Sequence, residues 1–400
     1  TTWPFIRSNT GMICMTMTEP KPERILVYEF ISAGAIDAGP IGAGESGDEL
    51  STAADPDWSC EGESLLQQGI SMRDAMVADL IAAGGYDIGV AASDAAPFAP
   101  ANDSAGVLPS TPALLSEASR RQCPSRCTAL RVPAGGSPTA FLARLAPHFD
   151  RVWVVAPETD GILAELCHAV EPQRWVGCSE DAIVTCSSKR ATREALALHG
   201  IAVPVAWQPG ETEPQADDAW IVKPDDGAGT QDTRRHARFA AAREDFAARR
   251  QAGRSATLEQ WVAGEPLSLS LLCRCDRTEL LCINRQRIEL EVDGTLSYHG
   301  VETDIEPTGS HRSRQLAELA HRIRAAMPGL AGFVGVDLVW TPEGRPVVIE
   351  INPRQTCAYV GLSRHLGRNL AVEILTSGEP VPTSSPAVRA PEITTTAPGA

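Results

Sequence analysis

Two predicted strands near the end of the chain place carboxylate and amide side chains where they could bind a metal ion. The segments 333–340 and 346–351 are mostly apolar and flank Thr341-Pro-Glu-Gly344, which predicts an antiparallel hairpin with a four-residue loop. In that register Asp337 faces Val348. Because strand side chains alternate between faces, one face is wholly apolar, with Val336, Leu338 and Trp340 beside Val347, Ile349 and Ile351.

The opposite face of this hairpin carries Asp337, Glu350 and Asn352. The two carboxylates are expected to lie diagonally, ~7–8 Å apart at the backbone, which is close enough to hold ions between them. Carboxylate and amide oxygens are hard ligands that suit Mg²⁺, with Mn²⁺ as an alternative, and phosphate often completes the shell. Arg354 follows the strand and could face an anion. The alternative is a solvated polar face, which the apolar opposite face disfavours.

A second group of residues could bind phosphates. Lys223 ends a predicted strand and is followed by Asp225-Asp-Gly-Ala-Gly-Thr230, which includes Gly227 and Gly229. Backbone N–H groups of a flexible glycine loop and a lysine ammonium can both bind phosphate oxygens. Lys189, near the start of a predicted helix, could add a second charge. Taken singly, a plain glycine-rich turn and a solvated surface lysine remain alternatives.

The segment around residues 259–265 could bind a nucleoside. Glu259, Gln260 and Val262 lie in a short predicted strand that leads into Glu265. A strand backbone can pair with an adenine edge, and a carboxylate can accept hydrogen bonds from ribose hydroxyls. Alone, this signal is weak.

Composition excludes several classes of protein. The chain has 400 residues, 43% hydrophobic and 22% charged, with a net charge of −16. We expect no non-specific nucleic-acid binding, because an acidic chain repels phosphate backbones, and no membrane span, because no apolar run of ~18 residues occurs. The 11 cysteines show no repeated spacing, which indicates free thiols in a reducing cytoplasm.

Strands and helices alternate in the first half of the chain. The predicted strands are 24–31, 86–90 and 151–156, and the predicted helices are 64–83, 139–149 and 161–170. This rhythm predicts an α/β domain with a parallel sheet.

The second half has a different, α+β character. Helices are predicted at 187–199, 234–254 and 315–327, and strands at 220–223, 258–262, 267–275 and 279–284 in addition to the hairpin. The predicted organisation is a flexible leader (1–22), an N-terminal α/β domain (23–177), a two-lobed domain (178–377) and a disordered tail (378–400).

The order and spacing of these residues resemble the ATP-grasp superfamily over about 178–375, and the preceding α/β unit resembles the N-terminal domain of that superfamily. The resemblance implies roles for residues already named. Lys189 and Lys223 would bind the α- and β-phosphates of ATP, and Gly227 and Gly229 would belong to a lid loop. Glu259, with the backbone of Gln260 and Val262, would contact adenine, and Glu265 would bind ribose. Two Mg²⁺ ions would be held by Asp337, Glu350 and Asn352.

Several phrases are similar to the tyramine–L-glutamate ligase group of that superfamily. They are Ile25-Leu-Val-Tyr-Glu-Phe-Ile31, Ser64-Leu-Leu66 with Met72, Val155-Ala-Pro-Glu-Thr-Asp-Gly-Ile162, Gly264-Glu-Pro-Leu-Ser268 and Asn284-Arg-Gln286. This similarity implies an enzyme that joins L-glutamate to tyramine or a similar amine in the biosynthesis of methanofuran-type one-carbon cofactors. The segment 94–140 and the tail depart from the group, which leaves the acceptor open.

The implied reaction needs no side-chain nucleophile. A substrate carboxylate attacks the γ-phosphate of ATP, and an amine then displaces phosphate from the acyl phosphate to give an amide. A cation near the transferred group would lower both barriers, and Arg285, Arg287 and Arg354 are the candidates, with Arg285 favoured. The expected partners are small-molecule carboxylates and amines, and a homodimer is left open. The alternatives are another amino-acid or peptide ligase of this superfamily, and a non-catalytic ATP-binding scaffold.

Overall fold

The computed structural model describes residues 22–34, 57–99, 124–214, 218–227, 230–307 and 309–378, with the backbone alone described for 57–63. Gly229 lies outside the described residues, as do the predicted leader and tail except for their boundary residues. Within the described part, no helix is both long and apolar enough to cross a membrane. The predicted domain boundaries stay a prediction.

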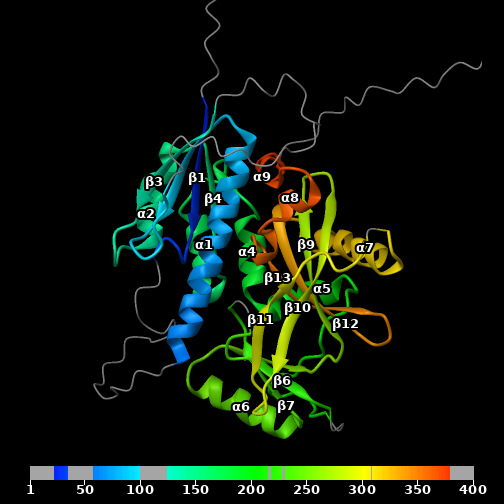
Figure 1. Ribbon diagram of the computed structural model, residues 1–400. Coiled ribbons are helices and arrows are strands. Elements are labelled where there is room, and N and C mark those ends of the chain that lie inside the picture. The colour runs from blue at the N-terminus through cyan, green and yellow to red at the C-terminus, as the bar shows by residue number, and fades with distance from the viewer. Residues whose placement is uncertain are drawn as a thin grey trace, which may run out of the picture.

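The N-terminal half forms a parallel sheet of five strands, as the alternating pattern predicts (Figure 1). The strand order is β3 (Arg126–Arg131), β2 (Tyr86–Ala92), β1 (Glu23–Glu29), β4 (Arg151–Val155) and β5 (Trp175–Val176). The associated helices are α1 (Asp57–Ala83), α2 (Pro138–Leu145) and α3 (Ile162–His168). The order reverses direction between β1 and β4, and ligands of such sheets bind beyond the carboxyl ends of the strands at this point.

A small antiparallel sheet follows, with the order β7 (Arg234–His236), β6 (Trp220–Pro224) and β8 (Ala256–Gln260). Helix α6 (Phe239–Gln251) covers one face of it, where Phe239 and Phe246 pack against Trp220, Val222 and Leu258. The prediction of a helix from 234 is wrong for its first residues. Arg234 to His236 pair with β6 instead, and the helix begins only at Phe239.

The large antiparallel sheet has the order β11 (Leu296–Glu302), β10 (Thr278–Leu290), β9 (Glu265–Cys273), β12 (Gly332–Trp340) and β13 (Pro346–Asn352). Its apolar face packs against α4 (Glu180–Ser187), α5 (Lys189–Leu198) and α7 (His311–Ala326). At one end of the other face, Leu272 and Phe333 pack with α1 and with α9 (Leu370–Leu375), which follows α8 (Leu362–Leu366). Farther along, that face becomes polar.

The register of the β12–β13 hairpin differs from the sequence prediction. Leu338 pairs with Val348, and Asp337 pairs directly with Glu350, so the predicted Asp337–Val348 pairing is wrong. Ile349 is an extra residue that bulges out of the ladder. Because Trp340 pairs with Pro346, five residues, 341–345, join the strands, and within this loop the N–H of Thr341 bonds the carbonyl of Arg345 at 3.0 Å. The bulge brings the two carboxylates opposite each other rather than diagonal.

Candidate functional site

The carboxylates of the hairpin lie in a ring of polar side chains. The Oδ1 atom of Asp337 accepts a hydrogen bond from Gln286 Nε2 at 3.0 Å, and its Oδ2 atom accepts one from Asn352 Nδ2 at 3.1 Å. Burial, and then the charge of the facing Glu350, raise the pKa of Asp337 to about 7. A divalent cation would offset this repulsion, and the two carboxylates with one amide oxygen are the donors that Mg²⁺ prefers. The residues therefore fit the predicted ion.

Lys189 reaches the same ring from the first turn of α5. Ser188 caps this helix, since its Oγ accepts a hydrogen bond from the N–H of Ala191 at 3.1 Å. The buried Nζ atom of Lys189 lies 3.5 Å from Glu350 Oε1 and donates to the carbonyl oxygen of Gly227 at 2.9 Å. The structure thus brings the predicted phosphate lysine, the glycine loop and a predicted metal ligand together.

Lys223 and Glu259 form a second buried pair on the small sheet. Lys223 Nζ lies 2.9 Å from Glu259 Oε2, and the two side chains are 5% and 2% exposed. Strand β6 pairs Lys223 with Thr257 of β8, so Glu259, two residues on, shares its face. The backbone N–H of Gln260 already donates a hydrogen bond to the carbonyl oxygen of Val205 at 2.7 Å. Val262 lies just after the strand and is half-buried.

The sequence contains only three lysines among 35 basic residues. Two of the three, Lys189 and Lys223, are the buried cations just described. The remaining 32 basic residues are arginines, so lysine in this chain is concentrated at the candidate site.

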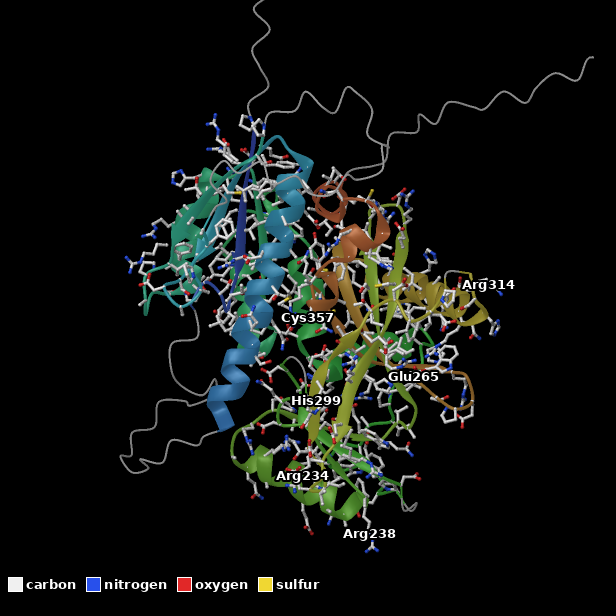
Figure 2. The ribbon with its side chains drawn as sticks, in the orientation of Figure 1. Arg234, Arg238, Glu265, His299, Arg314 and Cys357 are labelled. Carbon is white, nitrogen blue, oxygen red and sulfur yellow. The ribbon has the colours of Figure 1, made fainter. Side chains whose placement is uncertain are left out.

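Glu265 and Arg285 lie away from this cluster. Arg285 pairs with Leu267 in the ladder and so projects from the face that packs on α7, opposite to Asp337. Its Nε atom bonds Glu265 Oε1 at 2.7 Å, and Arg312 bonds the other oxygen of Glu265 at 2.6 Å. Although burial raises the pKa of Glu265, these hydrogen bonds lower it overall. In Figure 2, Glu265 lies toward α7 and Cys357 toward α1.

The structure therefore does not bring Glu265 or Arg285 to the carboxylate ring, and their predicted roles gain no support. Arg287 is exposed and lies within an irregularity of β10 between Gln286 and Ile288.

Arg354, the third candidate, lies in a buried ion pair with Glu158. Its Nη2 atom is 2.8 Å from Glu158 Oε2, and the side chains are 11% and 2% exposed. Among the described residues, Arg354 Nε and Glu158 Oε1 have no hydrogen-bond partner. Two residues after Glu158, the N–H of Asp160 donates a hydrogen bond to Asp226 Oδ2 at 2.9 Å, which connects the segment after β4 to the glycine loop. Arg354 thus joins the carboxylate ring to the parallel sheet.

Sequence reasoning missed the roles of two buried glutamates. Glu158 follows β4 and Glu29 ends β1, so both stand at the carboxyl edge where the strand order reverses. Glu29 accepts hydrogen bonds from the N–H groups of Ser32 at 2.7 Å and Ile31 at 3.2 Å, and burial raises its pKa. The available signal was their position near the ends of the predicted strands 24–31 and 151–156, although the sequence did not predict that these strands are neighbours.

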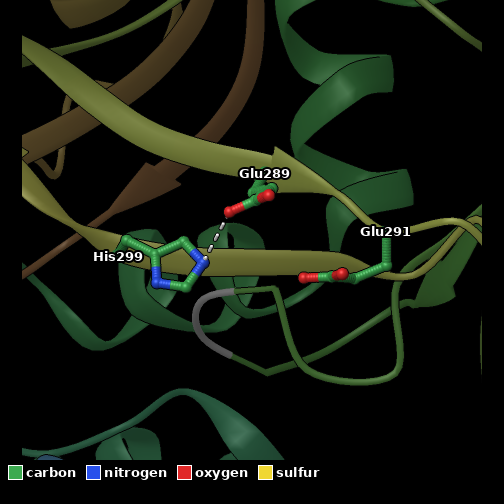
Figure 3. Close-up of side chains that lie close together, drawn as sticks. All are labelled: Glu289, Glu291 and His299. Atoms are coloured by element: carbon green, nitrogen blue, oxygen red, sulfur yellow. Dashed lines mark ion pairs between the residues drawn. The ribbon is translucent and has the colours of Figure 1, made fainter.

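One exposed group resembles a metal site without joining the ring. Glu289 of β10, Glu291 just after that strand and His299 of β11 lie together on the surface, with His299 Nε2 3.4 Å from Glu289 Oε2 (Figure 3). All three side chains are exposed, and exposed acidic groups need no ion to be stable.

Comparisons with known proteins agree with this arrangement. Residues 186–358 match the family model of an ATP-grasp domain, and residues 113–183 match that of a pre-ATP-grasp domain. No relative was found among curated proteins.

Similar solved structures share the fold. A protein from Archaeoglobus fulgidus described as an ATP-grasp superfamily member is 20% identical, with a TM-score of 0.53 over 89% of each chain. The L-amino acid ligase of Bacillus licheniformis is 14% identical, with a TM-score of 0.53 over 90% of this chain and 75% of that one. The D-alanine–D-alanine ligase of Bacillus anthracis, complexed with ATP, is 11% identical, with a TM-score of 0.52 over 89% and 97%. At these identities the likeness shows the fold alone, and the two family models identify an ATP-grasp domain at 186–358 and a pre-ATP-grasp domain at 113–183.

Proposed function

We propose that the protein is an ATP-dependent carboxylate–amine ligase that forms an amide through an acyl phosphate. The observation that carries the proposal is the buried ring in which Lys189 meets Glu350 opposite Asp337. Two facing carboxylates with a lysine and a glycine loop beside them are suited to a metal-bound triphosphate. A sheet whose only task was structural would gain little from burying these charges.

Each residue has a distinct task in this reaction. Asp337, Glu350 and Asn352 would hold Mg²⁺, which when bound would offset the charge of the ATP phosphates. Lys189 and Lys223 would exchange their present carboxylate partners for phosphate oxygens, with Gly227 in the loop beside them. Glu259 would be released toward the nucleoside as Lys223 turns to phosphate.

Arg354 is our candidate for the cation that stabilises the developing charge. It is buried beside the ring, whereas Arg285 projects from the other face of the sheet and Arg287 is exposed. The substrate carboxylate would attack the γ-phosphate with loss of ADP. The amine would then attack the acyl carbon, losing a proton as phosphate leaves. A guanidinium within reach of both the phosphate and the carbonyl oxygen would serve both steps.

We propose L-glutamate and tyramine, or a similar amine, as the substrates, in the biosynthesis of a methanofuran-type cofactor. The phrases quoted from 25–31, 155–162, 264–268 and 284–286 support this choice. An amine acceptor agrees with Glu29 and Glu158 at the reversal point of the parallel sheet, because a buried carboxylate can bind an ammonium group. Glu158 lies in one of these phrases, and Glu29 in another.

A second candidate is ligation of two amino acids. Its support is the fold shared with the L-amino acid ligase of Bacillus licheniformis and the D-alanine–D-alanine ligase of Bacillus anthracis. Both candidates use the same ring of residues and differ only in the amine.

The test is phosphate release from ATP and Mg²⁺ with L-glutamate, comparing tyramine, other aryl amines and amino acids, with the product identified by mass. Release that requires both glutamate and tyramine would support the first candidate, and release with two amino acids would support the second. ATP binding without phosphate release from any pair would overturn the ligase proposal in favour of a non-catalytic scaffold.

A further inference from the structure

A pocket of about 460 Å³ opens on the outside of the small sheet. It lies where α5, the segment 206–209, the last turns of α6 and the segment 253–258 meet. Its volume is within the ~300–1,000 Å³ usual for small-molecule sites. None of Lys189, Lys223 or Glu259 lines it, but Arg190, next to Lys189, and Asp225, at the start of the glycine loop, do, so the pocket lies beside the candidate nucleotide site.

The lining of this pocket is strongly basic in an acidic protein. Arg190, Arg193, Arg250 and Arg254 face it, against a single acidic residue, Asp225. Both carboxylate oxygens of Asp225 are already engaged, one by the hydroxyl of Ser188 at 2.7 Å and one by the N–H of Arg190 at 2.9 Å. The aspartate therefore holds the start of α5, and no ion pair among the described residues joins it to these arginines.

The arginines themselves are poorly neutralised. Arg190 and Arg193 share Glu194, at 3.4 and 3.9 Å, and Arg254 lies 3.4 Å from Asp232, in pairs whose members are mostly exposed. Such surface contacts contribute ~0–1 kcal/mol and are readily exchanged. Arg250 lies over the ring of Phe246, 5.6 Å from its centroid.

One polar atom of the lining points to a ligand more directly. Arg193 Nε is buried and has no hydrogen-bond partner among the described residues. Burying a donor without a partner is costly, and a bound anion with several acceptor oxygens would satisfy such donors. Trp207, whose ring packs edge-on against Phe246, adds an apolar wall.

We propose that this pocket is a second anion site that takes a small phosphate-bearing molecule. A guanidinium fork matches the geometry of phosphate oxygens, and four of them around one pocket provide local positive charge in an acidic chain. The shared chemistry is a phosphate group, whose source is either inorganic phosphate or an organic phosphate monoester with its carbon part against Trp207. The proposal does not depend on the ligase reaction.

Binding of two probes, inorganic phosphate and ribose 5-phosphate, tests the site by calorimetry. The titrations use the full chain saturated with a non-hydrolysable ATP analogue, so that the nucleotide site is filled. The test variant is R193Q/R250Q. The matched control is R238Q, because Arg238 is an exposed arginine at the other end of α6 and does not line the pocket (Figure 2).

We expect at least one probe to bind at millimolar concentration or below, and R193Q/R250Q to weaken it by roughly tenfold or more while R238Q leaves it unchanged. The tighter probe identifies the source of the phosphate. Absence of binding by both probes, or equal binding by wild type and R193Q/R250Q, or equal weakening by R238Q would overturn the proposal. If thermal unfolding shows that R193Q/R250Q does not fold, R250Q/R254Q replaces it, since both of those side chains are exposed.

Discussion

Replacing Lys223 by methionine tests the electrostatics of the small sheet. The ammonium lies 2.9 Å from Glu259 Oε2, and an effective dielectric constant of ~20 gives an attraction of about 6 kcal/mol at that distance. The cost of removing both charges from water offsets much of this gain. The variant, however, loses the attraction and keeps the cost, because Glu259 stays 2% exposed and unpaired. We therefore expect Lys223→Met to lower the free energy of unfolding by ~3–5 kcal/mol.

Two further variants separate the buried charge from other effects. Lys223→Met combined with Glu259→Leu removes both charges, and we expect it to recover most of the lost stability, because replacing a buried pair by apolar groups is often neutral. Arg24→Met breaks an exposed pair with Asp150, 3.2 Å long with side chains 36% and 43% exposed, and should cost less than ~1 kcal/mol.

The assay is urea denaturation followed by far-ultraviolet circular dichroism, with ATP binding measured on the folded protein. Lys223→Met and the double variant should both lose ATP affinity, although their stabilities differ. A loss below ~1 kcal/mol in Lys223→Met, or a double variant no more stable than the single one, would refute the energetic argument. Wild-type ATP affinity in both would refute the phosphate role of Lys223.

Three more predictions concern other parts of the site. Asp337→Asn should lower phosphate release by at least about 100-fold with an unchanged circular dichroism spectrum, and wild-type release would contradict the metal assignment. Ser188→Ala should lower the free energy of unfolding by ~1 kcal/mol through loss of the α5 cap, as measured by urea denaturation. Gly264→Ala should destabilise the protein by at least ~2 kcal/mol more than Gly85→Ala. The reason is that a Cβ at Gly264 would overlap the carbonyl of Trp340, whereas one at Gly85 meets open space. Equal melting temperatures of the two variants would contradict this.

The parallel sheet and the hairpin were predictable because their strands are strongly apolar and regularly spaced. Strands β1, β2 and β4 are buried through most of their length, so a continuous apolar run marks each of them. Strand β3 escaped prediction because its side chains are mostly exposed at the sheet edge, and β5 because it is two residues long. Strand β7 was hidden in an arginine-rich run that continues into a true helix.

The candidate site was predictable in residue type but not in its geometry. Asp337 and Glu350 pair directly only because of the bulge at Ile349, and no local sequence pattern predicts this bulge. Arg285 lies on the opposite face of the five-stranded sheet from these two carboxylates. Predicting this requires the register of β10 against β9, which the sequence alone does not give. Glu158 reaches Arg354 across 196 positions of sequence, a contact that only the packing of the parallel sheet on the large sheet creates.

The choice of lysine at two buried positions bears on how the site works. In a chain with 32 arginines, the usual cation would be a guanidinium, whose planar fork best serves one carboxylate at a time. Lys189 instead directs one ammonium to three oxygens on two segments: the carbonyls of Asp226 and Gly227 in the glycine loop, and the carboxylate of Glu350 on β13. A compact charge with three rotatable donors can leave one of these partners for a phosphate oxygen while keeping the others, and a rigid fork cannot. Under the proposed function, the two lysines would therefore lie where interactions are exchanged as ATP binds.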